Sequence, residues 1–330
     1  MNIPPFTISS KAINLIAAIS AQIERYAIRL EQSDGLLLRK SNRIKTVYGS
    51  LAIEGNRLLE SQVTDIINGK NVIAPPRDIQ EVKNAIETYN LYPNLNPFSE
   101  KDLLKAHGVM MKALQDDAGR YRSSGVGVFR GTQCVHMAPP PLMVPTLMAD
   151  LFEWLKKSDD HLLIRSSVFH YEFEFIHPFS DGNGRTGRLW QSLILGRLNP
   201  IFEHLPIENM VHFHQQEYYN AIEQSRVAND SSPFIDFMLQ NIFDTLKSHQ
   251  GDEIENVGIN VGINVGINVG KTEQKVLGLL CKNPQLTVKE IADKLGITLR
   301  QGERIMSALK NGGIIKRVGP NKGGHWEITE

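Results

Sequence analysis

The chain has 330 residues, which is enough for two or more compact domains. Its apolar content of 41% and charged content of 22% are typical of a soluble globular protein, and its formal net charge at pH 7 is zero. No apolar run approaches the roughly 18 residues of a membrane span, and the first residues lack the pattern of a secretion signal. Two cysteines and no zinc-ligand spacing predict a reduced, cytoplasmic protein that makes no contact with a membrane.

The first 250 residues are dominated by apolar patterns with helical spacing. Cap signals mark some of the helix starts, with Ser9 or Ser10 near the N-terminus and Ser99 further on. The pattern predicts a mainly α fold with helices over residues 11–32, 42–53, 61–68, 78–92, 99–114, 144–155, 161–175, 184–198, 212–229 and 233–249.

The helix predicted over 42–53 is followed by an acidic residue in an unusual place. Gly55 is a typical C-terminal cap, because glycine adopts positive φ without strain. Glu54 therefore stands at a helix C-terminus, where the helix dipole disfavours a carboxylate by up to about 1 kcal/mol. Such a placement indicates a tertiary or functional role, and the alternative is an ordinary surface carboxylate.

A short hairpin is predicted in the middle of the helical region. Val126 and Val128 alternate with other residues as strand residues do, and so do Val135 and Met137. Residues 125–137 therefore predict two antiparallel strands.

The densest group of functional residue types is His-Pro-Phe-Ser-Asp-Gly-Asn-Gly-Arg-Thr-Gly-Arg, residues 177–188. Gly182 and Gly184 would let backbone N–H groups approach phosphate oxygens, and a helix beginning near Gly184 would add its dipole. Arg185 and Arg188 lie about one helical turn apart, so both guanidinium groups can face the same phosphates. The spacing predicts an anion site.

The same segment carries a candidate base and a candidate metal ligand. His177 precedes the glycines and is placed to take a proton from a hydroxyl near neutral pH. Asp181 offers the hard oxygen that Mg²⁺ prefers beside phosphate oxygens. Taken singly, each residue has a structural explanation in an ordinary loop. Together they favour nucleotide chemistry.

This stretch resembles the signature of the Fic family, His-x-Phe-x-[Asp/Glu]-Gly-Asn-Gly-Arg-x-x-Arg, at every fixed position. The resemblance implies transfer of AMP from ATP, with Mg²⁺, to a hydroxyl of a target protein. It implies that His177 is the general base and that Asp181 is the metal ligand. It also implies a buried anchor, Phe179, and a set of nucleotide-binding residues: Gly182, Asn183, Gly184, Arg185, Thr186, Gly187 and Arg188. Within this set, Asn183 would hold the α-phosphate, and Arg185 and Arg188 the β- and γ-phosphates.

A second, upstream segment is similar to the inhibitory motif of the family, [Ser/Thr]-x-x-x-Glu-[Gly/Asn]. Ser50, Glu54 and Gly55 stand at its fixed positions. The resemblance implies that Glu54 pairs with Arg188 and occupies the place of the γ-phosphate. In some relatives this glutamate also helps to remove AMP from targets.

Two further segments resemble parts of the family fold more loosely. Residues 119–140 resemble the flap, whose edge holds the target backbone by strand addition over 125–137. Val126, Gly127 and Val128 would cover the nucleotide; the alternative is a surface hairpin without a partner. The pair Tyr218 and Tyr219 resembles the helix that lines the adenine pocket, although a tyrosine pair on a helix also fits core packing and we expect only one to face the site.

Residues 256–270 form a near-perfect Asn-Val-Gly-Ile repeat. In an extended strand every Val and Ile would lie on one face, which would allow pairing with a second copy of the chain in a homodimer. The glycines also fit a flexible linker over 251–270, and this interpretation is preferred.

Residues 271–330 resemble a winged helix. Helices are predicted over 271–281, 287–296 and 299–311, followed by a two-stranded wing over 314–318 and 325–329. Eleven Lys and Arg residues against six Asp and Glu residues make this segment basic. If it binds DNA, the groove would face Arg300, Gln301 and Arg304, and phosphates would meet Lys316, Arg317 and Lys322. The alternative is a protein-binding module.

The sequence thus predicts a Fic-type helical bundle with a β-hairpin flap and a C-terminal winged helix-turn-helix domain. The expected divisions are an N-terminal region with an inhibitory helix at about 42–55, a catalytic core, a linker and a winged-helix domain, at residues 1–100, 101–250, 251–270 and 271–330. The predicted function is autoinhibited adenylylation of a Ser, Thr or Tyr hydroxyl on a target protein or on the chain itself. The alternatives are phosphate transfer and a DNA-binding regulator whose core senses nucleotide or is idle.

Overall fold

The computed structural model describes residues 3–32, 35–130, 133–248, 276–277, 279–280, 284–295, 298–311, 315–318 and 325–328. The chain divides into two compact units, Met1–Gly251 and Asp252–Glu330, which are described separately. The predicted repeat linker at 251–270, Lys322 and most of the predicted helix 271–281 lie outside the described residues. Among the helices of the described ranges, none has both the length and the apolar character needed to cross a membrane.

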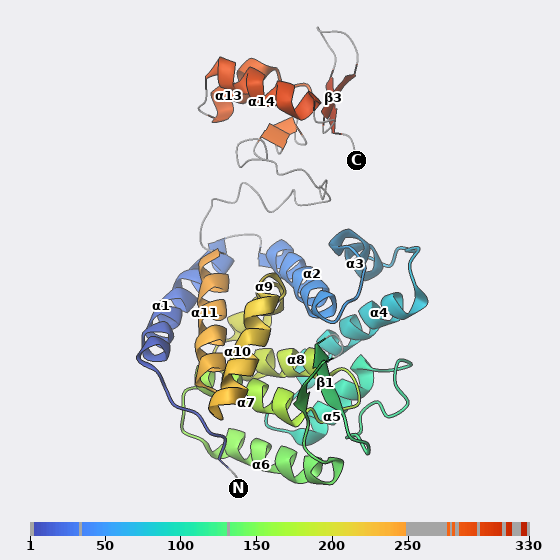
Figure 1. Ribbon diagram of the computed structural model, residues 1–330. Helices are drawn as coiled ribbons and strands as arrows, with labels where there is room; N and C mark the ends of the chain where they lie inside the picture. Colours follow the sequence, from blue (N-terminus) through green and yellow to red (C-terminus); the bar gives the residue numbers. More distant parts are fainter. Residues whose placement is uncertain are drawn as a thin grey trace. The chain divides into compact units, whose positions relative to one another are not determined.

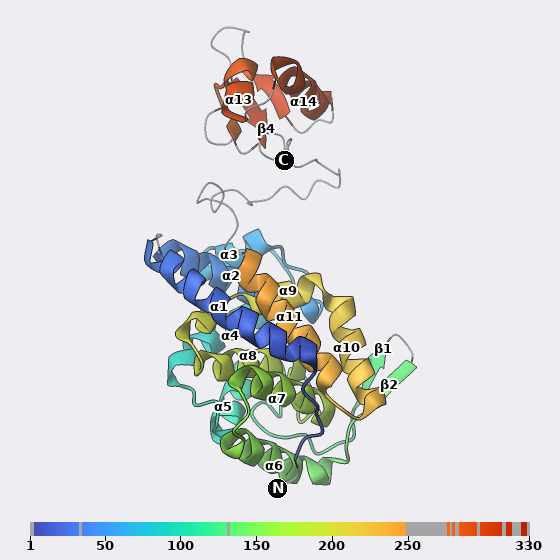
Figure 2. The same cartoon turned by 90° about the vertical axis from the view of Figure 1, so that its left-hand side faces the viewer.

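The larger unit is built mainly of helices (Figure 1), and one small hairpin lies at its edge (Figure 2). Its helices are α1 Ser10–Gln32, α2 Gly35–Ile53, α3 Glu60–Ile67, α4 Pro76–Asn90, α5 Glu100–Met110, α6 Val144–Lys157, α7 Leu162–Ile176, α8 Asn183–Gly196, α9 Ile207–Phe213, α10 Gln215–Ala228 and α11 Ser232–Ser248. The hairpin consists of β1, Gly127–Arg130, and β2, Gln133–Met137, paired antiparallel with a register shift between Val128 and Phe129.

Helices α7 and α8 form the centre of this unit, and the segment that joins them carries the signature motif. α7 is buried around most of its circumference, as expected for a helix that other elements surround. Trp190 of α8 is fully buried and donates its Nε1–H to the Pro97 carbonyl at 3.0 Å. α1 packs along α11 at the outside, as both views show (Figure 2). The motif is therefore fixed to the most buried part of the fold.

Most predicted helices are present, and the differences have local causes. α2 begins at Gly35, earlier than the predicted residue 42, and α5 ends at Met110. The predicted helix 212–229 is divided at His214, whose φ of −111° and ψ of 34° end α9 before α10 begins. Ser9 is the cap of α1, because its Oγ accepts a hydrogen bond from the Ala12 N–H at 2.9 Å.

The smaller unit has the elements of a winged helix, which confirms the predicted fold class. They are α13 Val288–Leu295, α14 Leu299–Asn311, β3 Ile315–Val318 and β4 His325–Ile328. Both helices begin with a reciprocal capping box, from Thr287 with Glu290 and from Thr298 with Gln301. The two strands pair antiparallel, and Lys316 of β3 forms an ion pair with a glutamate of β4 at 3.0 Å.

The packing of α2 on α9 gives a stability prediction. At Gly49 a Cβ would lie 2.7 Å from the Asn209 Cα, so the two backbones approach too closely for any side chain. Gly49→Ala is expected to lower the free energy of unfolding by about 1–3 kcal/mol. Urea denaturation measures this, with Gly125→Ala as control, since a Cβ at Gly125 meets open space. Equal stability of the two variants would contradict the described packing.

Candidate active site

His177 occupies the turn directly after α7. It is the C-cap of that helix, with φ 50° and ψ 60°, and its N–H donates to the Phe173 carbonyl at 2.9 Å. This left-handed conformation is uncommon outside glycine and is found at functional sites. The imidazole is partly exposed, at 21%, and its Nδ1 lies 3.9 Å from Oε2 of Glu174. The predicted base therefore stands at the edge of the core with access to solvent.

The loop between α7 and α8 is closed by Asn183. The carboxamide of Asn183 accepts from the Phe179 N–H at 2.9 Å and donates to the Phe179 carbonyl at 2.9 Å. Phe179 itself is fully buried, as the predicted anchor should be. In this structure Asn183 thus stabilises the loop, and its role toward an α-phosphate stays a prediction.

His107 of α5 fixes the same loop from the other side. Its ring stacks on that of Phe179 with centroids 3.6 Å apart. Nδ1 accepts the N–H of Gly119 at 2.9 Å, so Nε2 carries the hydrogen and donates to the Asp181 carbonyl at 2.9 Å. Burial lowers the pKa of His107 to about 4, so the ring stays neutral at physiological pH. The sequence gives no signal for His107, because it lies on the apolar face of α5 without a motif around it.

Arg122 links the base of the hairpin to the loop. It is buried, and its guanidinium donates to the carbonyls of His177 at 2.8 Å, Pro139 at 2.6 Å and Ser124 at 2.9 Å. A buried charge is stable only when hydrogen bonds surround it, and here main-chain oxygens provide them. Arg122 therefore holds the residues flanking β1 and β2 against the end of α7, a role with no signal in the sequence.

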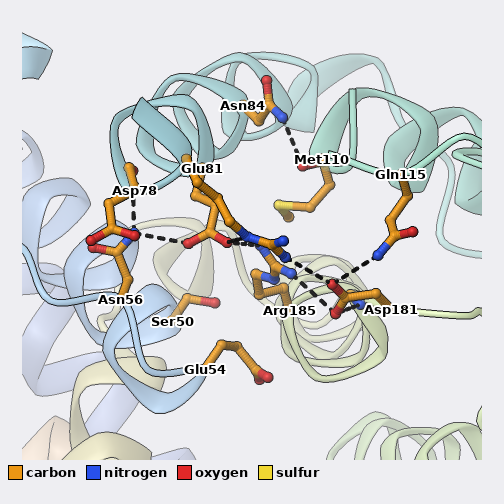
Figure 3. A network of polar contacts seen from close by, with 12 residues as sticks. Ser50, Glu54, Asn56, Asp78, Glu81, Asn84, Met110, Gln115, Asp181 and Arg185 are labelled. Carbon is orange, nitrogen blue, oxygen red and sulfur yellow. Dashed lines mark hydrogen bonds and ion pairs between the residues drawn. The ribbon is translucent and has the colours of Figure 1, made fainter. Parts of the chain in front are cut away.

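The first motif arginine lies between two carboxylates. Arg185 is 3% exposed, and its Nη2 lies 3.4 Å from Oδ1 of Asp181. Glu81 of α4 approaches Nη1 at 3.9 Å, and Figure 3 shows the two acids on opposite sides of the guanidinium. Within the described ranges the Nε and Nη1 groups of Arg185 make no hydrogen bond. Arg185 is thus a buried cation with free donors.

The second motif arginine holds the predicted inhibitory residue. Arg188 is buried, and its Nη2 donates to Oε1 of Glu54 at 2.8 Å and to the Ser50 carbonyl at 2.9 Å. The Glu54 carboxylate lies against Gly184 in the first turn of α8, where a Cβ would collide with it. The predicted pairing of Glu54 with Arg188 is present, and the carboxylate lies beside the end of α8 that favours an anion.

The turn after α2 is tied to α4. Gly55 has φ 85° and ends the helix as predicted. The Asn56 carboxamide then donates to Oε2 of Glu81 at 2.9 Å and to the Asp78 carbonyl at 3.2 Å (Figure 3). One chain of polar contacts therefore runs from the Glu54 turn through Glu81 to Arg185.

The two tyrosines predicted at the adenine pocket have different environments. Tyr218 is buried, and its hydroxyl is bonded to Nε2 of His170 at 3.0 Å. Tyr219 is 38% exposed, and its hydroxyl accepts from Gln215, which also donates to the Ile53 carbonyl at 3.0 Å. Tyr219 therefore lies toward the end of α2, while Tyr218 belongs to the core.

The predicted flap residues lie at the hairpin. The Val126 carbonyl accepts from the Ala138 N–H at 3.2 Å, and Gly127 pairs with Met137 across the hairpin. Val128 pairs with His136 next to the register shift. Within the described residues, no group of three or more His, Cys, Asp or Glu side chains that could hold a metal ion surrounds Asp181.

The fold and this arrangement define a Fic-type core: a histidine after one buried helix, and a glycine-rich turn with two buried arginines at the start of the next. A model of the Fic/DOC family matches residues 97–195, and a model described as winged helix-turn-helix DNA-binding matches residues 270–316. The structure is similar to the crystal structure of a Fic family protein from Desulfovibrio desulfuricans G20, with a TM-score of 0.72 and 38% sequence identity. That match covers 99% of this chain and 98% of the other. The chain belongs to the Fic family.

Curated relatives match part of the chain. A protein adenylyltransferase of Caenorhabditis elegans is 31% identical over 212 residues, which are 59% of this chain and 39% of the relative. One of Nematostella vectensis is 31% identical over 207 residues, with 58% and 45% covered. A probable protein adenylyltransferase of Aquifex aeolicus is 32% identical over 148 residues, or 43% of each chain. This chain spans about two fifths of the length of these relatives.

The contacts of His107 give a second prediction. His107→Leu leaves the Gly119 N–H and the Asp181 carbonyl without their partner, so the free energy of unfolding at pH 7 should fall by about 1–3 kcal/mol. The folded pKa of about 4 lies below the unfolded value of 6.5, so His107 destabilises the folded wild type as the pH falls through this range. The loss caused by the substitution should therefore shrink between pH 7 and pH 5.

Urea denaturation at both pH values measures the effect of His107→Leu. The control is His214→Leu, because His214 is exposed at the junction of α9 and α10. A loss that is the same at both pH values would show that the imidazole is not held neutral in the folded state.

Proposed function

We propose that this protein transfers AMP from ATP to a Ser, Thr or Tyr hydroxyl of a target protein and releases pyrophosphate. The observation that carries the proposal is the pair of buried arginines, Arg185 and Arg188, in the first turns of α8, directly after the loop that begins with His177. The printed names of the curated relatives support the same activity. Transfer at phosphorus depends mainly on positioning and on neutralising charge, and this site supplies both.

The phosphates are proposed to lie along the segment Gly182–Arg188. Gly182 has φ 80°, and a Cβ there would collide with the Met111 side chain, so only glycine gives this turn at the start of α8. The first N–H groups of a helix have no partner inside the helix and favour an anion. The free donors of Arg185 suit a phosphate, since a forked guanidinium binds two oxygens at once.

Asp181 is proposed to hold Mg²⁺ together with phosphate oxygens. A single carboxylate fits this ion, because Mg²⁺ is usually bound by one or two carboxylates, substrate phosphates and water rather than by an all-protein cage. The Asp181 side chain is 34% exposed and its Oδ1 accepts the Gly182 N–H at 2.6 Å, which orients the carboxylate. When bound, the ion would neutralise charge on the phosphates.

His177 is proposed to act as the general base. Its imidazole takes the proton of the target hydroxyl while that oxygen forms a bond to the α-phosphorus. The bond from this phosphorus to the oxygen that bridges to the β-phosphate breaks, and pyrophosphate leaves. The Arg122 contact to the His177 carbonyl and the left-handed turn hold the backbone of His177 at one place, and positioning of a catalytic group accounts for much of an enzymatic rate.

The target is proposed to dock on the hairpin over 125–137. A two-stranded ribbon has unpaired backbone groups along its edges, and an extended peptide can pair with them. The partly exposed Tyr219 is the better candidate for stacking on adenine, because Tyr218 is enclosed in the core. Self-modification, a homodimer and a cytoplasmic location stay predictions of the sequence.

Glu54 is proposed to inhibit the enzyme by taking the place of a phosphate. Its contact with Arg188 engages the cation that the γ-phosphate would otherwise use. A triphosphate would then lack one of its two arginines and meet a negative charge instead. The same carboxylate is the candidate for orienting water if the protein also removes AMP from its target.

Label transfer from ATP tests this function. With purified protein and cell lysate, Glu54→Gly should raise incorporation from ATP labelled at the α-phosphate by about tenfold or more. A second substitution, His177→Ala, should abolish this labelling, because general-base catalysis contributes about 10²–10⁴-fold and the ring is its source. Glu60→Gly, in the first turn of α3, is the matched control and should resemble the wild type.

The position of the label separates the alternatives for the core. Incorporation from the γ-phosphate alone would establish phosphate transfer and contradict adenylylation. Equal incorporation by the wild type and Glu54→Gly would show that Glu54 does not inhibit. No incorporation from either position would favour the nucleotide-sensing or idle core.

A second candidate function concerns the winged helix, for which we propose binding to duplex DNA. The matching family model and the exposed Arg300 and Arg304 on α14 support it. Gln301 is less suited to contact bases than predicted, because its carboxamide caps the helix at Thr298. Lys316 is likewise less suited to contact a DNA phosphate, because it forms an ion pair with a glutamate of β4.

Binding to labelled duplex DNA across a salt series tests this proposal. Affinity should fall steeply as salt rises, and Arg300→Ala with Arg304→Ala should weaken binding and flatten the salt slope by about two. Lys310→Ala, near the end of α14, serves as the control. Absence of binding at low salt would contradict DNA recognition and favour a protein partner.

A further inference from the structure

A second acidic residue lies beside His177 and has no part in the function proposed above. Glu174 is on α7, one turn before His177, and its side chain is 12% exposed. Its Oε2 lies 3.9 Å from Nδ1 of His177, and its Oε1 lies 3.9 Å from Nε2 of His170. The carboxyl group therefore stands between two imidazoles.

His170 cannot donate a hydrogen bond to this carboxyl group. Its Nδ1 donates to Oε1 of Gln191 at 2.6 Å, and its Nε2 accepts from the Tyr218 hydroxyl at 3.0 Å. Burial lowers the pKa of His170 to about 3, so the ring remains neutral with this arrangement of hydrogens. The other imidazole, that of His177, can donate a hydrogen bond to Glu174 after a small rotation of the side chains.

Gly187 makes room for the carboxyl group. A Cβ at this position would lie 3.0 Å from Oε1 of Glu174 and 3.2 Å from the Phe173 ring. The glycine between the two motif arginines thus allows the acid to lie against α8. Within the described residues, Oε1 of Glu174 is buried without a hydrogen bond. A buried oxygen without a partner lowers the stability of the fold, so its presence indicates a further role.

The charges around Glu174 come from several elements. Burial raises the pKa of Glu174 to about 8; Arg188 acts against this, and Glu54 adds to it. The titratable and charged groups that face it are His170, His177, Arg188, Glu54, Tyr218 and Tyr219. The acid is therefore close to the ion pair of Glu54 with Arg188.

We propose that Glu174 is a positioning residue for His177: its carboxylate accepts the Nδ1–H of the imidazole, which places the lone pair on Nε2, the atom that takes the hydroxyl proton. A carboxylate in this place fixes the ring and its tautomer, and its negative charge stabilises the imidazolium that forms when the proton arrives. The distance of 3.9 Å exceeds a hydrogen bond and shortens by rotation of the two side chains when the site is filled. This inference rests on the proposed role of His177 as base.

A pH dependence follows from the charge that Glu174 needs for this role. Its folded pKa is raised, so the carboxylate form grows as the pH rises through about 8. Transfer by the wild-type site should therefore increase with pH across this range. Removal of Glu54 takes away a negative charge that raises the pKa of Glu174. In Glu54→Gly the rise of transfer with pH should therefore occur at lower pH.

Nitrogen NMR of the histidine rings tests the contact without using activity. In full-length protein labelled with ¹⁵N-histidine, His177 is assigned by comparison with His177→Ala and titrated in the wild type and in Glu174→Gln. Above about pH 8, where Glu174 is ionised, its replacement should lower the proton affinity of His177 and weaken the preference of the ring for Nδ1–H. An unchanged titration and tautomer would overturn the proposal. The control is Glu172→Gln, a half-buried acid on the same helix that lines a different cavity, of about 410 Å³.

Kinetics in the Glu54→Gly background give the second readout. Glu174→Gln should lower kcat by about 10–100-fold, leave KM for ATP nearly unchanged and remove the rise with pH, whereas Glu172→Gln should change none of these. Glu174→Asp keeps the charge, should retain part of the rise with pH, and replaces the glutamine variant if that variant does not fold. An unchanged kcat and pH profile in Glu174→Gln would contradict positioning. If NMR shows the coupling and no variant transfers label, the contact stands and adenylylation is wrong.

Discussion

The ion pair between Glu54 and Arg188 is the contact on which the state of this site depends. Arg188 is buried in α8, and a buried guanidinium requires an anionic or polar partner. Glu54 provides that partner from the C-terminal end of α2, a position that its own helix disfavours. Under the proposed function a nucleotide phosphate is the alternative partner, so that two anions compete for one cation. The helix that carries Glu54 packs against α9.

The rest of the site is held in place by hydrogen bonds within the chain. Asn183 closes the loop on Phe179, His107 holds the Asp181 carbonyl, and Arg122 fixes the His177 carbonyl. These bonds are made by neutral groups or by a guanidinium surrounded by carbonyl oxygens, and none of them engages Arg185 or Arg188. A preformed cradle of this kind suits chemistry that depends on positioning and charge. The proposed inhibition would then require one removable contact, that of Glu54 with Arg188.

The sequence predicted the family, the helical fold and the pairing of Glu54 with Arg188, because each depends on local spacing or on a short motif. It also predicted a cap at Ser9 or Ser10, of which Ser9 is the cap in the structure, and the cap at Gly55. It could not identify His107, Arg122 or Glu81, since their partners are main-chain atoms or side chains far away in the chain and no motif surrounds them. The apolar Phe175 near the end of α7 is exposed, because helical spacing gives the direction of a side chain and not the depth of the neighbouring elements.

The measurement that tests the central claim most directly is the affinity of the full-length protein for ATP with Mg²⁺, compared by calorimetry between the wild type and Glu54→Gly. If Glu54 occupies the position of a phosphate, the variant should bind ATP about tenfold or more tightly, and additional substitution of Arg188 by Ala should remove the gain. Equal affinities in the wild type and the variant would contradict the account, because the ion pair would then not compete with the nucleotide.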